Sequence, residues 1–449
     1  MSFSQLPAEL QIQIFSYLRV PDLKSARGVC RRFRDHASVS LFRSIVACAR
    51  YQAMGAFQKV ALHSVYPTYV KEIIFDGSMY DGGLANNEYA YQQRADDFED
   101  LRGVVSWARR SRFKRYQELY KEQEDIKNGH VLLQTIARAL EWMPNVFSIV
   151  YSPGPHHIPG EAKLMKETIP RGVIATHSSF LTPRRGKLQD GIHHVIGAVY
   201  IAQYTGIREF KVEPARHNPS KPGTEFTLCA FDFEEPGHLE AGKYFFRHLH
   251  KLELSLSLLS PLGRGAAPVG REALDCLANM AALLLEAKDL RDLKLHLAHY
   301  DVSPQRMYGH IIPHGQPIYP FLGLGAKWPN LRSLSLEGIY AEEEDLKDLI
   351  SRHKETLVSL QFSFCSLFSG KWSNIVDDVV YTTNILPFVL GRVHETTIRD
   401  VPFSNIPDDE AERWQYEGQV QVNAEGERYF DEPPDKSVYA WRNQGQVEA

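Results

Sequence analysis

The stretch LHKLELSL at residues 249–256 recurs as LRDLKLHL at 290–297 and as LRSLSLEG at 331–338. In each stretch the last leucines alternate with polar residues, so they lie on one side of a β-strand. The three stretches start 41 residues apart. A strand that returns at a constant interval predicts a structural unit that is repeated along the chain.

Four further segments show the same spacing, in which an apolar residue is followed by apolar residues three and five positions later. Between the strand-like segments lie stretches with helical apolar spacing, at 130–145, 271–290 and 341–356. Strands that alternate with helices predict an α/β fold in which a parallel sheet is coiled as a solenoid. The four further segments are Val70-Ile73-Phe75, Val146-Ile149-Tyr151, Ile207-Phe210-Val212 and Leu357-Leu360-Phe362.

The pattern L-x-x-L-x-L resembles that of the leucine-rich-repeat family, which implies a protein-binding receptor. The seven segments start 76, 61, 42, 41, 41 and 26 residues apart, whereas the usual repeat has roughly 20–29 residues. We therefore expect an irregular version with inserted loops at 152–190, 260–270 and 301–320, which would gather on one face and form the binding surface. A helical repeat of about 40–47 residues is the alternative, but it does not explain the strand-like segments.

The N-terminal segment LPAELQIQIFSYLRVPDLKSARGVCRRFRDHASVSLFRSI at 6–45 has helical apolar spacing throughout. Leu10, Ile14 and Leu18 predict a helix over about 8–18. Pro21 is expected to break the chain and Asp22 to cap a second helix. Three short helices bury too little surface to be stable alone, so the unit should need a partner surface. The second helix would carry Leu23, Ala26, Cys30 and Phe33, and a third apolar group is Leu41, Phe42 and Ile45.

The motifs LPAEL, IFSYL, PDL and VCRRFR, at these intervals, resemble the F-box, in a protein of the fungal type. The resemblance covers only about residues 4–45 and implies that the segment docks the Skp-family adaptor of SCF-type cullin ubiquitin ligases. Phe33 stands where many family members carry tryptophan. The alternative is a hairpin that packs on its own chain. The adaptor-binding residues that the resemblance implies are Leu6, Pro7, Leu10, Ile14, Leu18, Leu23, Val29 and Phe33.

Three domains are expected: the F-box at 1–48, the repeat region at 49–372 and an acidic C-terminal tail at 373–449. Residues 1–50 hold eight Lys/Arg against three Asp/Glu, whereas residues 401–449 hold four against eleven. The ends therefore differ in charge sign, which suggests different roles. The acid and proline content of the tail favours a peripheral hairpin or a partly disordered arm.

The composition argues against several classes of partner. A formal net charge of -4 gives no general attraction to nucleic acid or to an anionic membrane. The N-terminus lacks a signal-peptide layout and no stretch reaches ~18 consecutive apolar residues, which favours a cytoplasmic or nuclear location. Five scattered cysteines without C-x-x-C spacing indicate reduced structural thiols.

The sequence contains no recognisable catalytic motif and therefore predicts a protein that is not an enzyme and needs no metal or cofactor. The histidine pairs at 156–157 and 193–194, and the spaced pair His296 and His299, lack neighbouring carboxylate or thiol ligands. The segment FLGLGAKW at 321–328 reads as a turn rather than a dinucleotide loop. The basic run RRSRFKRY at 109–116 leads into acidic residues, which favours a solvated charged helix over a nucleic-acid patch.

These observations predict a substrate-recognition subunit of an SCF-type ligase, which binds the adaptor through the F-box and a protein substrate through the repeat region. The sequence leaves two alternatives open. One is an enzyme whose distant catalytic residues form no visible motif, and the other is a repeat scaffold with an internally packed N-terminal hairpin.

Overall fold

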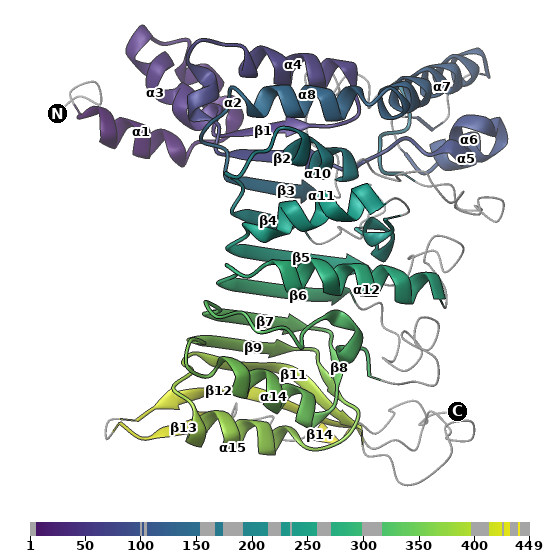
Figure 1. Ribbon diagram of the computed structural model, residues 1–449. Coiled ribbons are helices and arrows are strands. Elements are labelled where there is room, and N and C mark those ends of the chain that lie inside the picture. Colours follow the sequence, from purple (N-terminus) through teal and green to yellow (C-terminus); the bar gives the residue numbers. More distant parts are fainter. Residues whose placement is uncertain are drawn as a thin grey trace, which may run out of the picture. The chain divides into compact units, whose positions relative to one another are not determined.

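The computed structural model describes residues 6–98, 101–102, 106–152, 167–173, 192–213, 226–233, 236–257, 271–298, 317–396, 413–423, 426–431 and 439–440. The described chain is mixed α/β and divides into two compact units, Met1–Glu225 and Phe226–Ala449. Each unit contains its own set of parallel strands with helices between them (Figure 1).

The N-terminal hairpin consists of helices α1 (Ala8–Ser16), α2 (Val20–Ala26) and α3 (Arg31–Leu41). The expectation that Pro21 breaks the chain is wrong, because Pro21 lies in the first turn of α2, where its missing N–H is not needed. Arg19, not Asp22, is the N-cap of that helix. The hairpin therefore begins its second helix earlier than the sequence suggested.

The expected second helix is in fact split in two. The chain turns after α2, and the Cys30 Sγ accepts a hydrogen bond from the Phe33 N–H (3.4 Å), which caps α3. Leu23 and Phe33 therefore lie on different helices. The third apolar group forms no helix of its own, because Leu41 ends α3 and Ile45 belongs to the first strand.

Unit 1 contains a parallel sheet of four strands that pair in the order β1-β2-β3-β4. Ile73, Ile149 and Phe210 stand in one row across it and are each no more than 1% exposed. Such rows form because paired residues of neighbouring strands lie side by side and point to the same face of the sheet. The strands are β1 (Ser44–Ala47), β2 (Glu72–Asp76), β3 (Ser148–Ser152) and β4 (Glu209–Val212).

Three helices, α4, α8 and α10, pack side by side on one face of this sheet (Figure 1). The 3-10 helix η2 (Tyr66–Tyr69) connects α4 to β2. Each helix precedes a parallel strand, so the three helices run in the same direction. The helices are α4 (Tyr51–Ala61), α8 (Val131–Leu140) and α10 (Ile192–Ile201).

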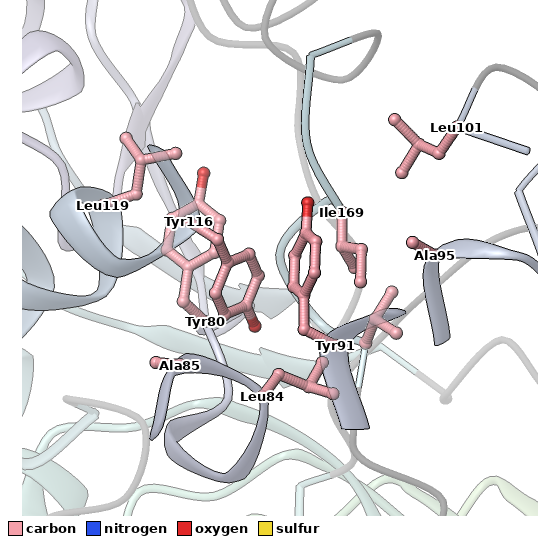
Figure 2. Packing of buried hydrophobic residues seen from close by; sticks show 10 residues of the cluster. Tyr80, Leu84, Ala85, Tyr91, Ala95, Leu101, Tyr116, Leu119 and Ile169 are labelled. Carbon is pink, nitrogen blue, oxygen red and sulfur yellow. The ribbon is translucent and has the colours of Figure 1, made fainter. Parts of the chain in front are cut away.

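An insertion between β2 and α8 forms helices α5 (Gly82–Asn86), α6 (Glu88–Ala95) and α7 (Ser106–Asn128). The basic run at 109–116 lies in α7, as the sequence predicts, but the helix also buries Tyr116 and Leu119. Figure 2 shows the resulting cluster, in which Tyr80, Tyr91 and Tyr116 pack together with leucine, isoleucine and alanine side chains. Burial raises the pKa of the Tyr116 phenol well above its ordinary value.

Part of the expected loop at 152–190 is not a surface loop. Residues 168–173 are buried, and Ile169 and Val173 belong to the tyrosine cluster. Arg171 Nη2 lies 2.9 Å from Asp76 Oδ2, and both side chains are at most 1% exposed. A buried charge needs such a partner, so this ion pair holds the segment against the end of β2.

Unit 2 contains parallel strands in the order β5-β6-β7-β9-β11. Its first buried row is Leu252, Leu293, Leu334, Leu360 and Phe388, each at most 2% exposed. The strands are β5 (Lys251–Ser257), β6 (Asp292–Ala298), β7 (Ser333–Glu337), β9 (Ser359–Ser363) and β11 (Phe388–Thr396).

Helix α11 and the 3-10 helix η3 precede β5, and the connections between these strands contain helices α12, α14 and α15 and the 3-10 helix η5. The segment FLGLGAKW is a turn with Gly323 in the left-handed region (φ 71°), as expected, and it buries Trp328. The bounds are η3 (Leu228–Phe231), α11 (Pro236–Arg247), α12 (Arg271–Glu286), η5 (Tyr319–Leu322), α14 (Glu343–His353) and α15 (Trp372–Thr382).

Three neighbouring strands of unit 2 bend at one position. Gly338, Phe364 and Arg392 follow residues that are paired in one row, and all three have positive φ (76°, 51° and 55°). The Phe364 N–H donates to the Gly391 carbonyl oxygen (2.8 Å), so the row stays hydrogen-bonded through the bend. Beyond it, β8 (Tyr340–Ala341) and β10 (Ser366–Leu367) continue the pairing.

The expected tail boundary at 372/373 falls inside α15, whose Ile375, Val376 and Val379 are buried. Buried packing therefore continues across the position where the acidic composition placed the start of the tail. Residues 397–412 of the expected tail lie outside the described residues. The end of the chain contributes antiparallel strands β12 (Arg413–Val422), β13 (Arg428–Asp431) and β14 (Tyr439–Ala440), with β12 paired to β11, β13 and β14.

All seven strand-like segments of the sequence lie at strands of the structure, β2 to β7 and β9, and the three expected helices are α8, α12 and α14. Parallel pairing within each unit agrees with the α/β prediction. The leucine-rich-repeat-like solenoid stays a prediction.

Candidate functional site

The N-terminal hairpin has a small core of its own. Phe15, Leu23 and Ala37 are buried, with Ala26, Phe33 and Leu41 packed partly buried around them. The rings of Phe15 and Phe33 meet edge to face with centroids 5.6 Å apart. Leu23, which the F-box resemblance implies as an adaptor contact, is only 4% exposed, and its side chain faces the inside of the hairpin.

Polar side chains fix the start of α1 on α3. Gln11 Nε2 donates to the Leu6 carbonyl oxygen (2.9 Å), and its Oε1 lies 2.9 Å from His36 Nδ1. Arg32 Nη2 also donates to the Leu6 carbonyl oxygen (2.9 Å). These bonds hold the Leu6–Pro7 segment, where Leu6 is half-buried and Pro7 is exposed.

One face of α1 presents apolar side chains to solvent. Leu10, Ile14 and Leu18 are 45%, 41% and 37% exposed, and they recur every four residues. Leu18 lies just beyond the end of α1, and its N–H donates to the Phe15 carbonyl oxygen (3.0 Å), which continues the turn. Three large apolar residues on one exposed face indicate a docking surface.

Two further apolar residues, which the sequence pattern did not assign to docking, are also exposed: Tyr17 (80%) and Val20 (53%). Tyr17 is three residues after Ile14, so helical spacing alone could have found it. Val29, which the F-box resemblance did imply, is 68% exposed. Phe33 is half-buried and contributes mainly to the core of the hairpin.

Residues 3–47 match the F-box-like family model. The match covers about a tenth of the chain and contains the whole hairpin. No curated protein matches the sequence. The chain thus carries an F-box-like domain, a module that binds Skp-family adaptors in SCF complexes and that suggests a role in a ubiquitin ligase.

The F-box-like domain is joined to the rest of unit 1 through stacked rings. Phe42, at the end of α3, stacks on Tyr66 of η2 with centroids 4.0 Å apart. The Arg27 guanidinium lies 5.1 Å from the centroid of the Phe42 ring and donates to the Tyr66 hydroxyl (3.0 Å). These contacts lie away from Leu10 and Ile14 in the sequence and leave both exposed.

Unit 2 offers a second candidate surface, the polar face of its strands. Ser255, His296 and Glu337 stand in one row on β5, β6 and β7. Ser255 Oγ lies 3.0 Å from His296 Nδ1, and His296 Nε2 lies 3.5 Å from Glu337 Oε1. Burial lowers the pKa of His296 more than the Glu337 carboxylate raises it. The ring is therefore neutral at pH 7.

The same three residue types form nucleophilic triads in hydrolases. Such a centre also needs free N–H donors for the oxyanion. Strand β6 is hydrogen-bonded to β5 on one side and to β7 on the other, so the sheet uses the amides around His296. The row therefore fits a contact surface better than a catalytic centre.

The described residues contain no group of three or more His, Cys, Asp or Glu side chains that could hold a metal ion. His193 and His194 lie in the first turn of α10, and His194 is buried. His156, His157 and His299 lie outside the described residues. No described helix is long and apolar enough to cross a membrane.

All five cysteines are free thiols. Cys30 is exposed and caps α3, Cys229 is half-buried, and the other three are buried. Burial raises the pKa of the Cys365 thiol to about 12. A thiol of this kind is a poor nucleophile, which agrees with the structural role expected from the sequence.

Proposed function

We propose that this protein is the substrate-recognition subunit of an SCF-type cullin-RING ubiquitin ligase. The F-box-like domain would bind the Skp-family adaptor, and the strand-rich region behind it would bind a protein substrate. The observation that carries this proposal is the exposed apolar face of α1, formed by Leu10, Ile14 and Leu18, within the segment that matches the F-box-like family.

The adaptor contact would follow the usual energetics of a helix interface. An exposed leucine or isoleucine that becomes fully buried contributes about 1.5–3 kcal/mol. The hairpin is already closed by its own core, so binding requires little ordering of the backbone. Leu10, Ile14, Tyr17, Leu18, Val20 and Val29 would supply the contact, with Pro7 at its edge.

In this proposal no side chain of the protein performs chemistry, and no metal or cofactor takes part. The protein would raise the effective concentration of the substrate near the transfer enzyme of the ligase. It would act in the cytoplasm or nucleus, where that ligase core works. The polar face around Ser255, His296 and Glu337 is one surface for the substrate, because hydroxyl, imidazole and carboxylate groups suit hydrogen-bonded recognition.

Reconstitution tests the proposal. The full-length protein is mixed with a purified Skp-family adaptor, cullin and RING subunit, and the complex is isolated by size exclusion. We expect one stoichiometric complex, and we expect ubiquitin transfer to a captured substrate only when this protein is present. A protein that elutes apart from the adaptor at micromolar concentrations contradicts the proposal.

An enzyme is the second candidate, and the hydrogen-bonded row Ser255–His296–Glu337 is the observation that favours it. A fluorophosphonate probe, which labels activated serines, separates the two candidates. We expect no labelling of Ser255 under conditions that label a control hydrolase. Stoichiometric labelling that is lost in Ser255→Ala would favour the enzyme.

A further inference from the structure

The turns between helix and strand in unit 1 each expose large apolar side chains. Leu62 (74% exposed) follows α4, Trp142 (60%) follows α8, and Ile201 (59%) ends α10. Val65 (43%) is the N-cap of η2 in the same connection as Leu62. We refer to Leu62, Val65, Trp142 and Ile201 as the turn strip.

The topology of unit 1 places the turn strip at one end of the helix layer. Helices α4, α8 and α10 pack side by side, and each leads into the next of the parallel strands β2, β3 and β4. Their C-terminal ends must therefore lie at the edge of the sheet where the strands begin. Residues far apart in the sequence, such as Leu62 and Ile201, are brought to the same edge in this way.

Hydrogen bonds connect these turns to each other and to the F-box-like domain. Arg27 Nη2 donates to the Tyr66 hydroxyl (3.0 Å), which joins the hairpin to η2. Asn145 Nδ2 donates to the Thr68 carbonyl oxygen (2.7 Å), which joins η2 to the turn after α8.

The series continues to the turn after α10, where the Tyr204 hydroxyl donates to the Val146 carbonyl oxygen (2.8 Å). The residues of the turn strip thus lie on successive turns that are hydrogen-bonded to one another, and the first of these turns is hydrogen-bonded to the hairpin. Val29, exposed on the hairpin, is two residues from Arg27, where that series begins.

Single exposed apolar residues are common on protein surfaces, but an aligned series of them marks an interaction site. Tryptophan in particular is enriched among the residues that dominate interface energies. The surrounding exposed side chains are mostly cations, Arg43, Lys59, Lys71 and Arg138, with Glu141 among them. A partner that fits this strip presents apolar side chains bordered by acidic ones.

We propose that the turn strip extends the adaptor-docking surface, so that the Skp-family adaptor contacts the edge of unit 1 as well as the F-box-like domain. This inference rests on the proposed function. The adaptor is the expected partner because the turn strip adjoins the hairpin. A protein that binds at Val29 would meet Val65 and Leu62 next, since hydrogen bonds connect the hairpin to their turn. The cationic side chains around the turn strip would then extend the excess of positive charge of residues 1–50, which contain eight Lys/Arg and three Asp/Glu.

Affinity measurements on the full-length chain test the extension. The strip variant is Trp142→Glu with Ile201→Glu, and the probe is a purified Skp-family adaptor in a calorimetric titration. The matched control is Leu285→Glu with Tyr381→Glu, two exposed apolar residues at the ends of α12 and α15 in unit 2. We expect the strip variant to bind the adaptor about 10–100 times more weakly, and the control to bind within twofold of wild type.

Hydrogen exchange on the unchanged protein provides a measurement that does not depend on how a variant folds. When the adaptor binds, amides at 62–66, 142–146 and 201–204 should exchange more slowly, together with those of α1. Protection of α1 alone would overturn the extension.

The outcomes separate this inference from the function on which it rests. If Leu10→Asp with Ile14→Asp abolishes adaptor binding while the strip variant binds like wild type, the extension is wrong and the ligase function stands. If the Leu10 and Ile14 variant also binds like wild type, both are wrong. If sedimentation shows a homodimer that the strip variant dissociates, the strip belongs to a second copy of the chain and the adaptor extension is overturned.

Discussion

The F-box-like hairpin and the sheet of unit 2 both have regularly spaced apolar residues, but these residues are exposed in the hairpin and buried in the sheet. Leu10 and Ile14 of α1 remain 45% and 41% exposed, whereas Leu293 and Leu334 of the sheet are 2% and 1% exposed. Both regions have a periodic apolar pattern, so the pattern does not explain the difference. The comparison shows that periodicity identifies an apolar face, while the elements around it decide whether that face is covered.

The number of packing layers explains the difference. Each inner strand of unit 2 has neighbouring strands on both sides and helices in its connections, which cover the leucine rows. The hairpin has three short helices around a core of Phe15, Leu23 and Ala37, and α1 has a second apolar face that no element of the described residues covers. A covered row stabilises the fold, and an uncovered one is available to a partner.

The largest effect should come from placing charges on the uncovered face. Leu10→Asp with Ile14→Asp should weaken adaptor binding by more than about 100-fold, because two charges would have to enter a dry interface. The stability of the protein should change by less than about 1 kcal/mol, because both side chains are exposed. Calorimetric titration and urea unfolding measure the two quantities.

Tyr89→Asp, at another exposed aromatic residue (71% exposed, in α6), is the control for that variant and should bind the adaptor like wild type. Equal losses in both variants would mean that the effect comes from general surface charge. The exposed face of α1 would then have no specific role in adaptor binding.

The second prediction concerns a covered leucine. Leu293→Ala in β6 should lower the free energy of unfolding by about 2–5 kcal/mol, because it leaves a cavity in a buried row. Leu10→Ala should change the same quantity by less than about 0.5 kcal/mol. Urea unfolding followed by circular dichroism compares them, and similar losses in both variants would contradict the comparison.

Leu23→Ala tests the hairpin core itself, with an expected loss of about 2–3 kcal/mol that is confined to the hairpin. Leu23 lies in a small separate core, so its loss should open the hairpin locally. Hydrogen exchange should show faster exchange in α1 to α3 and unchanged exchange in β5 to β7. Uniformly faster exchange would indicate that the hairpin and the sheets unfold as one cooperative body.

The smallest effect should be one of pH, in unit 2. Burial raises the pKa of Glu343, but hydrogen bonds from Lys347 Nζ (2.6 Å), the Lys371 N–H (2.7 Å) and Asn374 Nδ2 (3.0 Å) outweigh it and lower the pKa. A lowered pKa gives stability that is present above the pKa of the unfolded chain and lost as the pH falls through that of the folded protein.

Glu343→Gln should therefore lower the stability at pH 7 by about 1–2 kcal/mol, and the difference from wild type should shrink as the pH falls below about 4. Thermal unfolding at pH 7 and pH 3.5 measures this. Glu344→Gln, at the exposed neighbouring carboxylate, is the control and should show little change at either pH. A difference that grows in acid would show that the Glu343 carboxylate is not the stabilising form.

The comparison also explains which site residues the sequence could assign. The F-box motifs identified the segment that matches the F-box-like family, and within it Leu10, Ile14 and Leu18 are exposed. Leu23 was assigned to the same surface and is buried, because its helix turns that side toward Phe15 and Ala37. Burial depends on how α2 crosses α3, and one-dimensional spacing does not contain that information.

By itself, the sequence determined the local elements behind the N-terminal hairpin. All seven strand-like segments lie at strands and the three expected helices formed, because alternation and helical spacing depend only on neighbouring residues. The tertiary structure alone decided which apolar faces are covered, that residues 168–173 are buried with Arg171 against Asp76, and that Leu62, Trp142 and Ile201 come to one edge. These features join residues tens to more than a hundred positions apart, and such contacts arise from the packing of whole elements.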